Sequence, residues 1–181
     1  ALTGASCSQD ETPAGDGRTG VMAMTISTSR AEDNGEYDPL QYQKVYIYNS
    51  EGGLLRKYAA KDDIPERLEL LSGTYRVAVE AGEQVPADFS KRFYKGEETF
   101  TVKPGETTHA EVVCKIANTV VEVKFDASIV ENLDPGYFVW IAGTDKFDEA
   151  EAESGAVPAL KFTDEGTGYY TCLLYTSDAA D

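Results

Sequence analysis

The sequence predicts an all-β protein, in which an antiparallel β-sandwich is followed by the beginning of a second, truncated β domain. Short runs of alternating apolar and polar residues recur along the chain, as in strands that bury one face. Clusters of Gly, Pro and Asp separate these runs, and tight turns at such spacing are typical of sandwiches and barrels. A hydrophobic content of 41%, with 11 Tyr and 7 Phe, supplies enough apolar side chains for a packed core.

The first domain is expected to span residues 21–116. Its predicted strands are 21–27, 44–48, 54–58, 67–71, 74–80, 99–103 and 107–116. Glycines in the segments between them allow tight turns, as at Gly52-Gly53 and Gly73. Residues 61–66 are expected to hold one helical turn, because Asp62 and Asp63 can cap free backbone amides.

The second domain is expected to cover residues 117–171. Its predicted strands are 119–125, 136–143, 157–163 and 168–171, with a short helix at 128–133. About 55 residues are few for an independent sandwich, so this domain is expected to be truncated. No internal repeat is visible in the sequence.

The N-terminal segment indicates lipidation at Cys7. Small residues lead to this Cys, as at the end of a bacterial lipoprotein signal peptide, so residues 1–7 are expected to be the remnant of that peptide. The aliphatic residue usual three places before the Cys is replaced by Gly4, and the apolar region that should precede it is absent. Residues 8–20, polar and Gly-rich, are expected to be a flexible tether.

The C-terminal segment 172–181 matches, residue for residue, the forward translation of a common transposon-based sequencing adapter. A run of ten matches does not arise by chance. We therefore expect residues 172–181 to be an adapter artefact, and the natural chain to continue past Thr171.

Five segments resemble an uncharacterised lipoprotein family of Bacteroidetes-type bacteria. They are CSQDE at 7–11, VYIYNSEG at 45–52, LSGTYRV at 71–77, YKG at 94–96 with FTV at 100–102, and CKIANT at 114–119. The family carries a domain of unknown function and is similar in layout to fimbrillin and fimbrial-anchor proteins. The resemblance covers roughly residues 5–130 of this chain. The resemblance implies a transthyretin-like or Ig-like sandwich, an outer-membrane lipid anchor and a role in pili or adhesion. It implies no catalytic residue.

The remaining sequence features argue against catalysis and nucleic-acid binding. A net charge of -16 repels nucleic acid, and the 16 Lys and Arg are scattered. His109 is predicted to face solvent, and Cys114 to be a buried core thiol. No Ser or Cys nucleophile is paired with a base, so no enzymatic activity is expected.

Two weaker sets of candidate residues remain. Asp145, Asp148 and Glu149 lie in an acidic segment and could bind Ca²⁺, although a solvated loop is the simpler interpretation, and no cofactor is expected. Aromatic side chains that could form a carbohydrate platform, or pack in the core, are Tyr37, Tyr42, Tyr46, Tyr48, Tyr58, Phe93 and Tyr94. Trp140, in mid-strand, is predicted to be in the core.

These features predict a lipid-anchored structural or adhesive protein of the outer membrane and cell surface. Its partners are expected to be the membrane, through the lipid, and other surface or pilus subunits or glycans. A glycan- or protein-binding module of a nutrient-capture system is the alternative. A hydrolase in sequence beyond Thr171 remains a third hypothesis.

Overall fold

The computed structural model describes residues 18–29 and 37–171, and most of the elements predicted from sequence need only small changes of boundary. The strands of the first unit are β1 (Thr19–Thr28), β2 (Lys44–Asn49), β3 (Leu54–Tyr58), β4 (Arg67–Leu71), β5 (Gly73–Ala81), β6 (Ala87–Asp88), β7 (Tyr94–Val102) and β8 (Thr107–Ile116). Two short 3-10 helices are η1 (Pro39–Tyr42) and η2 (Lys61–Asp63). The second unit contains β9 (Thr119–Val123), α1 (Ala127–Asn132), β10 (Val139–Ala142), α2 (Glu149–Ser154), β11 (Ala159–Phe162) and β12 (Gly166–Tyr170).

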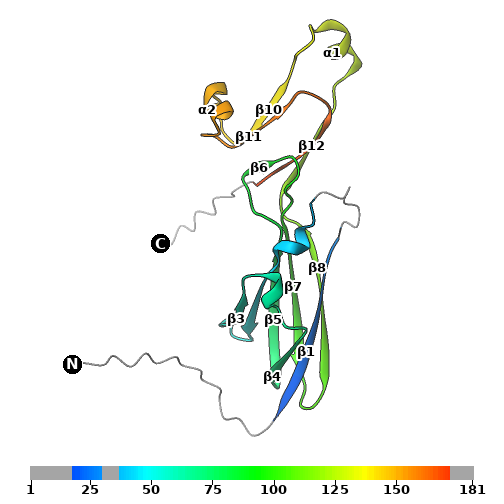
Figure 1. Cartoon of the computed structure of the whole chain (residues 1–181), viewed down its shortest axis with the longest axis vertical. Helices are drawn as coiled ribbons and strands as arrows, with labels where there is room; N and C mark the ends of the chain where they lie inside the picture. The colour runs from blue at the N-terminus through cyan, green and yellow to red at the C-terminus, as the bar shows by residue number, and fades with distance from the viewer. Residues whose placement is uncertain (1–17, 30–36, 172–181) are drawn as a thin grey trace, which may run out of the picture.

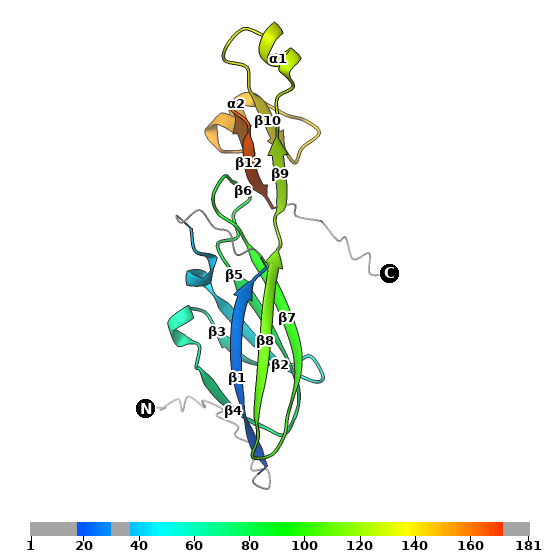
Figure 2. The same ribbon diagram turned by 90° about the vertical axis from the view of Figure 1, so that its right-hand side faces the viewer.

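The all-β prediction is confirmed, and the first unit has two layers. One layer has the strand order β3-β2-β5-β7 and the other β8-β1-β4 (Figures 1 and 2). The layers share ladder pairing at one end, where β7 and β8 pair at Tyr94↔Ile116 and Lys95↔Lys115, and the turn at residues 103–106 connects them at the other end. Between these ends the inward faces of the two layers enclose the core.

The pairing of β1 with β8 departs from the antiparallel prediction. β1 runs parallel to β8, from Val21↔Thr107 to Thr28↔Cys114, and antiparallel to β4. The alternation of apolar and polar residues shows which face of a strand is buried, but not whether the strand runs parallel or antiparallel to its neighbour. The sequence therefore could not predict the parallel pairing. Thr19 and Gly20, expected in the tether, already belong to this strand.

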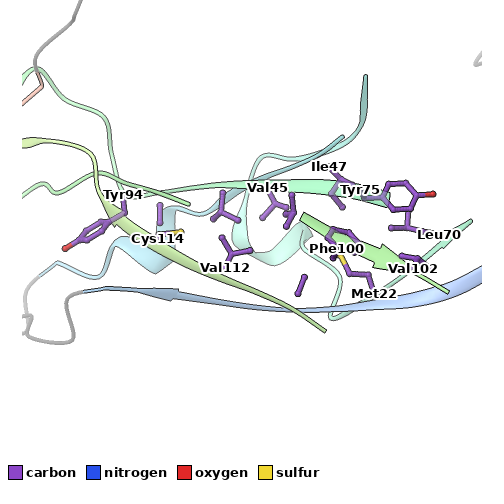
Figure 3. Close-up of a cluster of buried hydrophobic side chains, with 14 residues drawn as sticks. Met22, Val45, Ile47, Leu70, Tyr75, Tyr94, Phe100, Val102, Val112 and Cys114 are labelled. Atoms are coloured by element: carbon purple, nitrogen blue, oxygen red, sulfur yellow. The ribbon is translucent and has the colours of Figure 1, made fainter. Parts of the chain in front are cut away.

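The core of the first unit contains the alternating residues of both layers. Figure 3 shows Val45 and Ile47 of one layer together with Met22 and Val112 of the other. These four side chains are at most 1% exposed. Because apolar surface from both layers is removed from water in one cluster, this core is the main source of stability in the first unit.

A buried hydroxyl group links β5 to the end of β4. The Oη of Tyr75 donates to the carbonyl oxygen of Leu71 at 2.9 Å, while the ring stacks on Phe100 with centroids 5.8 Å apart. We predict that Tyr75→Phe lowers the free energy of unfolding by about 1 kcal/mol, because the ring stays packed and one hydrogen bond is lost. Urea denaturation measures the change. Tyr42→Phe, at an exposed ring, is the control, and equal effects of the two substitutions would contradict the prediction.

The two units meet at a junction around Asn118. Its Oδ1 accepts from the backbone amide of Phe93, and its Nδ2 donates to Thr171 Oγ1 at 3.1 Å. Thr171 Oγ1 in turn donates to the carbonyl oxygen of Val85 at 2.7 Å. The short strand β6 also pairs with β12, so a loop of the first unit is joined to the sheet of the second.

Gly82 allows the loop that carries β6 to pass close to the neighbouring chain. It has φ +94°, and a Cβ there would lie 2.0 Å from the carbonyl oxygen of Arg92. Only glycine accommodates both the backbone conformation and the approach.

Candidate functional site

The outward face of the β2-β5-β7 layer carries a shallow groove. Strand alternation points Tyr46 and Tyr48 outward, opposite the buried Val45 and Ile47. The groove measures about 350 Å³ and is lined by Tyr46, Tyr48, Ala78, Val79, Glu80, Lys95, Gly96 and Glu97. Ala78 lies in register between Tyr46 and Glu97, so a small side chain is flanked by larger ones on both neighbouring strands.

Charged pairs border the groove on both sides of Ala78. Arg76 Nη1 lies 3.0 Å from Glu97 Oε2, and Lys95 Nζ lies 3.6 Å from Glu80 Oε1. The Oη of Tyr46 donates to Glu80 Oε2 at 3.4 Å. Burial, followed by the negative charge of Glu80, raises the pKa of Tyr46. Such exposed pairs contribute little to stability, at most about 1 kcal/mol each, so a ligand can take over their hydrogen bonds at small cost.

The two tyrosine rings of the groove already have cationic neighbours. The guanidinium carbon of Arg76 lies 4.3 Å from the centroid of Tyr48, and Lys57 Nζ lies 5.6 Å from that of Tyr46. The groove therefore offers donors, acceptors and aromatic edges around a small apolar floor. This arrangement suits a neutral or mixed-charge ligand with several hydroxyl groups.

The other aromatic candidates are not gathered at this groove. Phe93 and Tyr94 are buried, and Tyr58 packs against the core. Tyr37 and Tyr42 stack on each other with centroids 5.8 Å apart, and Tyr37 Oη accepts from the backbone amide of Glu83 at 2.6 Å. The sequence predicted the outward direction of the β2 tyrosines, but not that Ala78 and Glu97 meet them.

The prediction that Trp140 is a core residue is wrong. Its side chain is half-buried on the outer face of the β10–β11 hairpin, in register with Lys161. Lys161 Nζ lies 5.1 Å from its ring, and the indole Nε1 donates to Glu149 Oε1 at 3.4 Å. The buried face of β11 instead carries Leu160 and Phe162. An apolar mid-strand residue was assigned to the wrong face, because four residues carry too little alternation to decide it.

Two of the three acidic candidates, Asp148 and Glu149, make hydrogen bonds within the second unit. Asp148 is the N-cap of α2 and accepts from the backbone amide of Glu151, and Gly155 ends the helix at φ 77°. The sequence Asp-x-x-Glu followed by Gly is the signal that would have revealed this helix. Over residues 18–29 and 37–171, no three His, Cys, Asp or Glu side chains form a group that could hold a metal ion. Asp145, Asp148 and Glu149 are thus not brought together as ligands.

The positions of His109 and Cys114 agree with the sequence. His109 is exposed on β8, and Cys114, on the same strand, is buried as a free thiol. Burial raises the pKa of Cys114 from 9.0 to about 11.

The shift of the Cys114 pKa predicts a loss of stability in alkali. Above pH 9 the unfolded thiol ionises while the folded thiol stays protonated, so stability falls as pH rises from 9.0 to about 11. We predict that Cys114→Val has a weaker alkaline loss than the parent chain. The urea midpoint of each protein is measured at pH 8 and at pH 10.5. The titration of tyrosine and lysine side chains, which the two proteins share, cancels when their losses are compared. Equal losses in both would contradict the prediction.

Cys7, most of the 8–20 tether and the segment 172–181 lie outside the described residues. In the part of the chain that the structure covers, no helix is long and apolar enough to cross a membrane.

Comparison with known proteins gives a family match and distant structural similarity. Residues 19–157 match the family described as Domain of unknown function (DUF4493). Among curated proteins, none matches significantly.

Three solved structures are matched, each at low identity and low structural similarity. A proposed polysaccharide-binding protein (DUF1812) of Bacteroides thetaiotaomicron is 11% identical, with TM-score 0.39, over 68% of this chain and 56% of that chain. A proposed adhesin of the same organism is 12% identical, with TM-score 0.42, over 87% and 71%. A minor pilin of Streptococcus agalactiae is 15% identical, with TM-score 0.36, over 61% and 48%. The chain thus spans about half the length of the first and third of these proteins.

Proposed function

This chain belongs to the DUF4493 family, and we propose that it is a non-catalytic structural or adhesive protein of the cell surface. In this role it is anchored through a lipid on Cys7, and its first unit acts as a spacer that holds later parts of the chain away from the outer membrane.

The observation that carries the proposal is the position of chain entry and exit in the first unit. β1 begins at one pole, where the amide of Gly105 donates to the carbonyl oxygen of Thr19 at 2.8 Å. The chain leaves at the opposite pole through Ala117 and Asn118, and the second unit extends from there (Figure 2). β8 carries the chain from the first pole to the second, and its ten residues span about 30 Å.

This geometry gives the N-terminal anchor a direction. A lipid on Cys7 places the pole that contains Thr19 and Gly105 toward the membrane, and the second unit at the distal end. Two features keep the spacer stiff: the shared core of its two layers, and the hydrogen bonds of Asn118 at the junction. Acidic side chains outnumber basic ones by 16, which favours projection into water over lying on an anionic membrane.

The experiment is to express the chain behind a complete lipoprotein signal peptide in a bacterium that exports lipoproteins. We expect the parent protein to incorporate labelled palmitate and to sediment with membranes. Cys7→Ala should lose both properties while its circular dichroism stays unchanged. Ser6→Ala, next to the acylation position, is the matched control. Membrane retention of Cys7→Ala would refute the anchor.

A second candidate function, binding of short glycans, is favoured by the groove around Ala78. Its rim offers hydroxyl, carboxylate and ammonium groups beside two aromatic rings, within about 350 Å³. Titration with short neutral and acidic oligosaccharides tests it by calorimetry. Tyr46→Ala and Tyr48→Ala should each weaken binding by at least about tenfold, while Tyr42→Ala, outside the groove, should not. Absence of binding, or equal affinity of all variants, would remove this candidate.

A further inference from the structure

The strands of the second unit repeat the pairing of the first four long strands of the first unit. β1 pairs antiparallel with β4, and β2 with β3. In the same order along the chain, β9 pairs antiparallel with β12, and β10 with β11. In both units the end of the fourth strand lies beside the start of the first, at Thr19↔Leu71 and at Thr119↔Tyr170. The sequence showed no repeat, because these pairings are made by different residues.

Three further strands complete the first unit. β5 adds antiparallel to β2, β7 adds to β5, and β8 adds parallel to β1. Within the described residues, β9 has β12 as its only neighbour and β10 has only β11. The edges of β9 and β10 that correspond to those covered by β8 and β5 are therefore open, and an open edge can pair with another strand.

Burial in the second unit is incomplete in the corresponding places. Val121, Val123 and Phe125 alternate on one face of the β9 segment but are only half-buried. In the first unit Met22, on the corresponding strand β1, is only 1% exposed. Large apolar side chains of the second unit are also exposed, namely Val120, Ile129, Val130, Leu133, Phe138 and Phe147. Small domains do not leave so much apolar surface uncovered without a partner.

We propose that residues 119–170 form the first half of a second sandwich with the topology of the first, completed by strands C-terminal to Thr171; the proposal rests on the prediction that residues 172–181 are an adapter artefact. One of the completing strands adds antiparallel to the edge of β10, and the last of them adds parallel to the edge of β9. The segment that carries these strands is about as long as the stretch from Gly73 to Ile116, which supplies the same strands in the first unit. Its own sequence alternates between apolar and polar residues, because its inward side chains cover Val121, Val123 and Phe125.

The position of Thr171 favours strands of the same chain, rather than strands of a separate partner, as the ones that cover the open edges. Its amide donates to the carbonyl oxygen of Pro86 at 2.8 Å, which fixes the exit of β12 beside the start of β9. From the equivalent place, after Leu71, the first unit turns directly into β5. A segment attached at this point has a high effective concentration at both open edges.

The test begins with a long sequencing read across the 3′ end of the gene, followed by two proteins: residues 1–171, and the natural chain extended through the predicted strands. Hydrogen exchange is compared over residues 119–125 and 139–142, with 75–81 of the first unit as internal reference. We expect exchange in the two test segments to slow at least about tenfold in the longer protein, with the reference unchanged. The proposal would be overturned by a reading frame that ends before it encodes three further segments of alternating apolar and polar residues. Equal hydrogen-exchange rates of the test segments in the two proteins would also overturn it.

A matched pair of variants in the longer protein separates strand addition from general stabilisation. Val121→Lys places a charge on the inward face of β9 and should abolish the slowing of hydrogen exchange in the longer protein. Glu122→Lys, on the outward face, should leave that slowing in place. If the 1–171 protein instead gains protection as its concentration rises, a second copy fills the edge and the proposal is wrong. These outcomes do not depend on Cys7, so they stand apart from the membrane-retention test.

Discussion

Ile47→Ala is expected to lower the free energy of unfolding by about 3 kcal/mol. Ile47 is 0% exposed at the centre of β2, between Arg56 of β3 and Val77 of β5 in register. Its side chain points into the cluster that joins the two layers (Figure 3). Removing three carbon atoms therefore leaves a cavity that a rigid pair of sheets cannot close.

Guanidinium denaturation followed by far-UV circular dichroism measures the effect of Ile47→Ala. Lys44→Ala is the control on the same strand, because its side chain is exposed, and its effect should stay within about 0.5 kcal/mol. A loss below about 1 kcal/mol for Ile47→Ala would mean that the layers do not share a close-packed core.

Asn118→Ala is expected to cost about 2 kcal/mol and to loosen the connection between the units. The substitution leaves the buried amide of Phe93 without its acceptor, and frees the hydroxyl group of Thr171 from one of its two partners. The neighbouring contacts of the junction, the β6–β12 pairing and the bond from Ala117 to Phe93, should weaken with it. The consequence is a wider range of angles between the units.

Two measurements follow Asn118→Ala. Hydrogen exchange at the Phe93 amide should accelerate, and small-angle X-ray scattering should show a broader distribution of the longest dimension. Asn132→Ala is the control, because Asn132 donates only to the carbonyl oxygen of Ser128 within α1. If both variants scatter like the parent chain, Asn118 does not hold the junction.

Strand positions were predictable from sequence wherever alternation ran for five residues or more. β2, β5 and β8 lie where their patterns place them, since one face of each is buried. β7 begins five residues earlier than predicted, because Gly96 and Glu98 interrupt its apolar face. β6 is only two residues long and is held by β12, so nothing local in its sequence marks it.

Strand direction and strand register were not predictable in the same way. The parallel pairing of β1 with β8 depends on the long path between them, and the groove around Ala78 depends on the register of three strands. Asp148, assigned to an acidic loop, instead begins a helix. The repeated topology of the two units became visible only in the pairing, because the paired residues differ.

The distance of each pole of the first unit from the membrane most directly tests the proposed role as a spacer. In the lipid-anchored chain ending at Thr171, Glu106→Cys labels the pole near Thr19 and Glu131→Cys labels α1 in the second unit. Both positions are exposed, and the buried Cys114 leaves the new thiol free to react selectively. A quencher in the lipid headgroups should dim a fluorophore at position 106 strongly and one at position 131 little. Equal quenching at the two positions, or stronger quenching at 131, would contradict a spacer that projects the second unit away from the membrane.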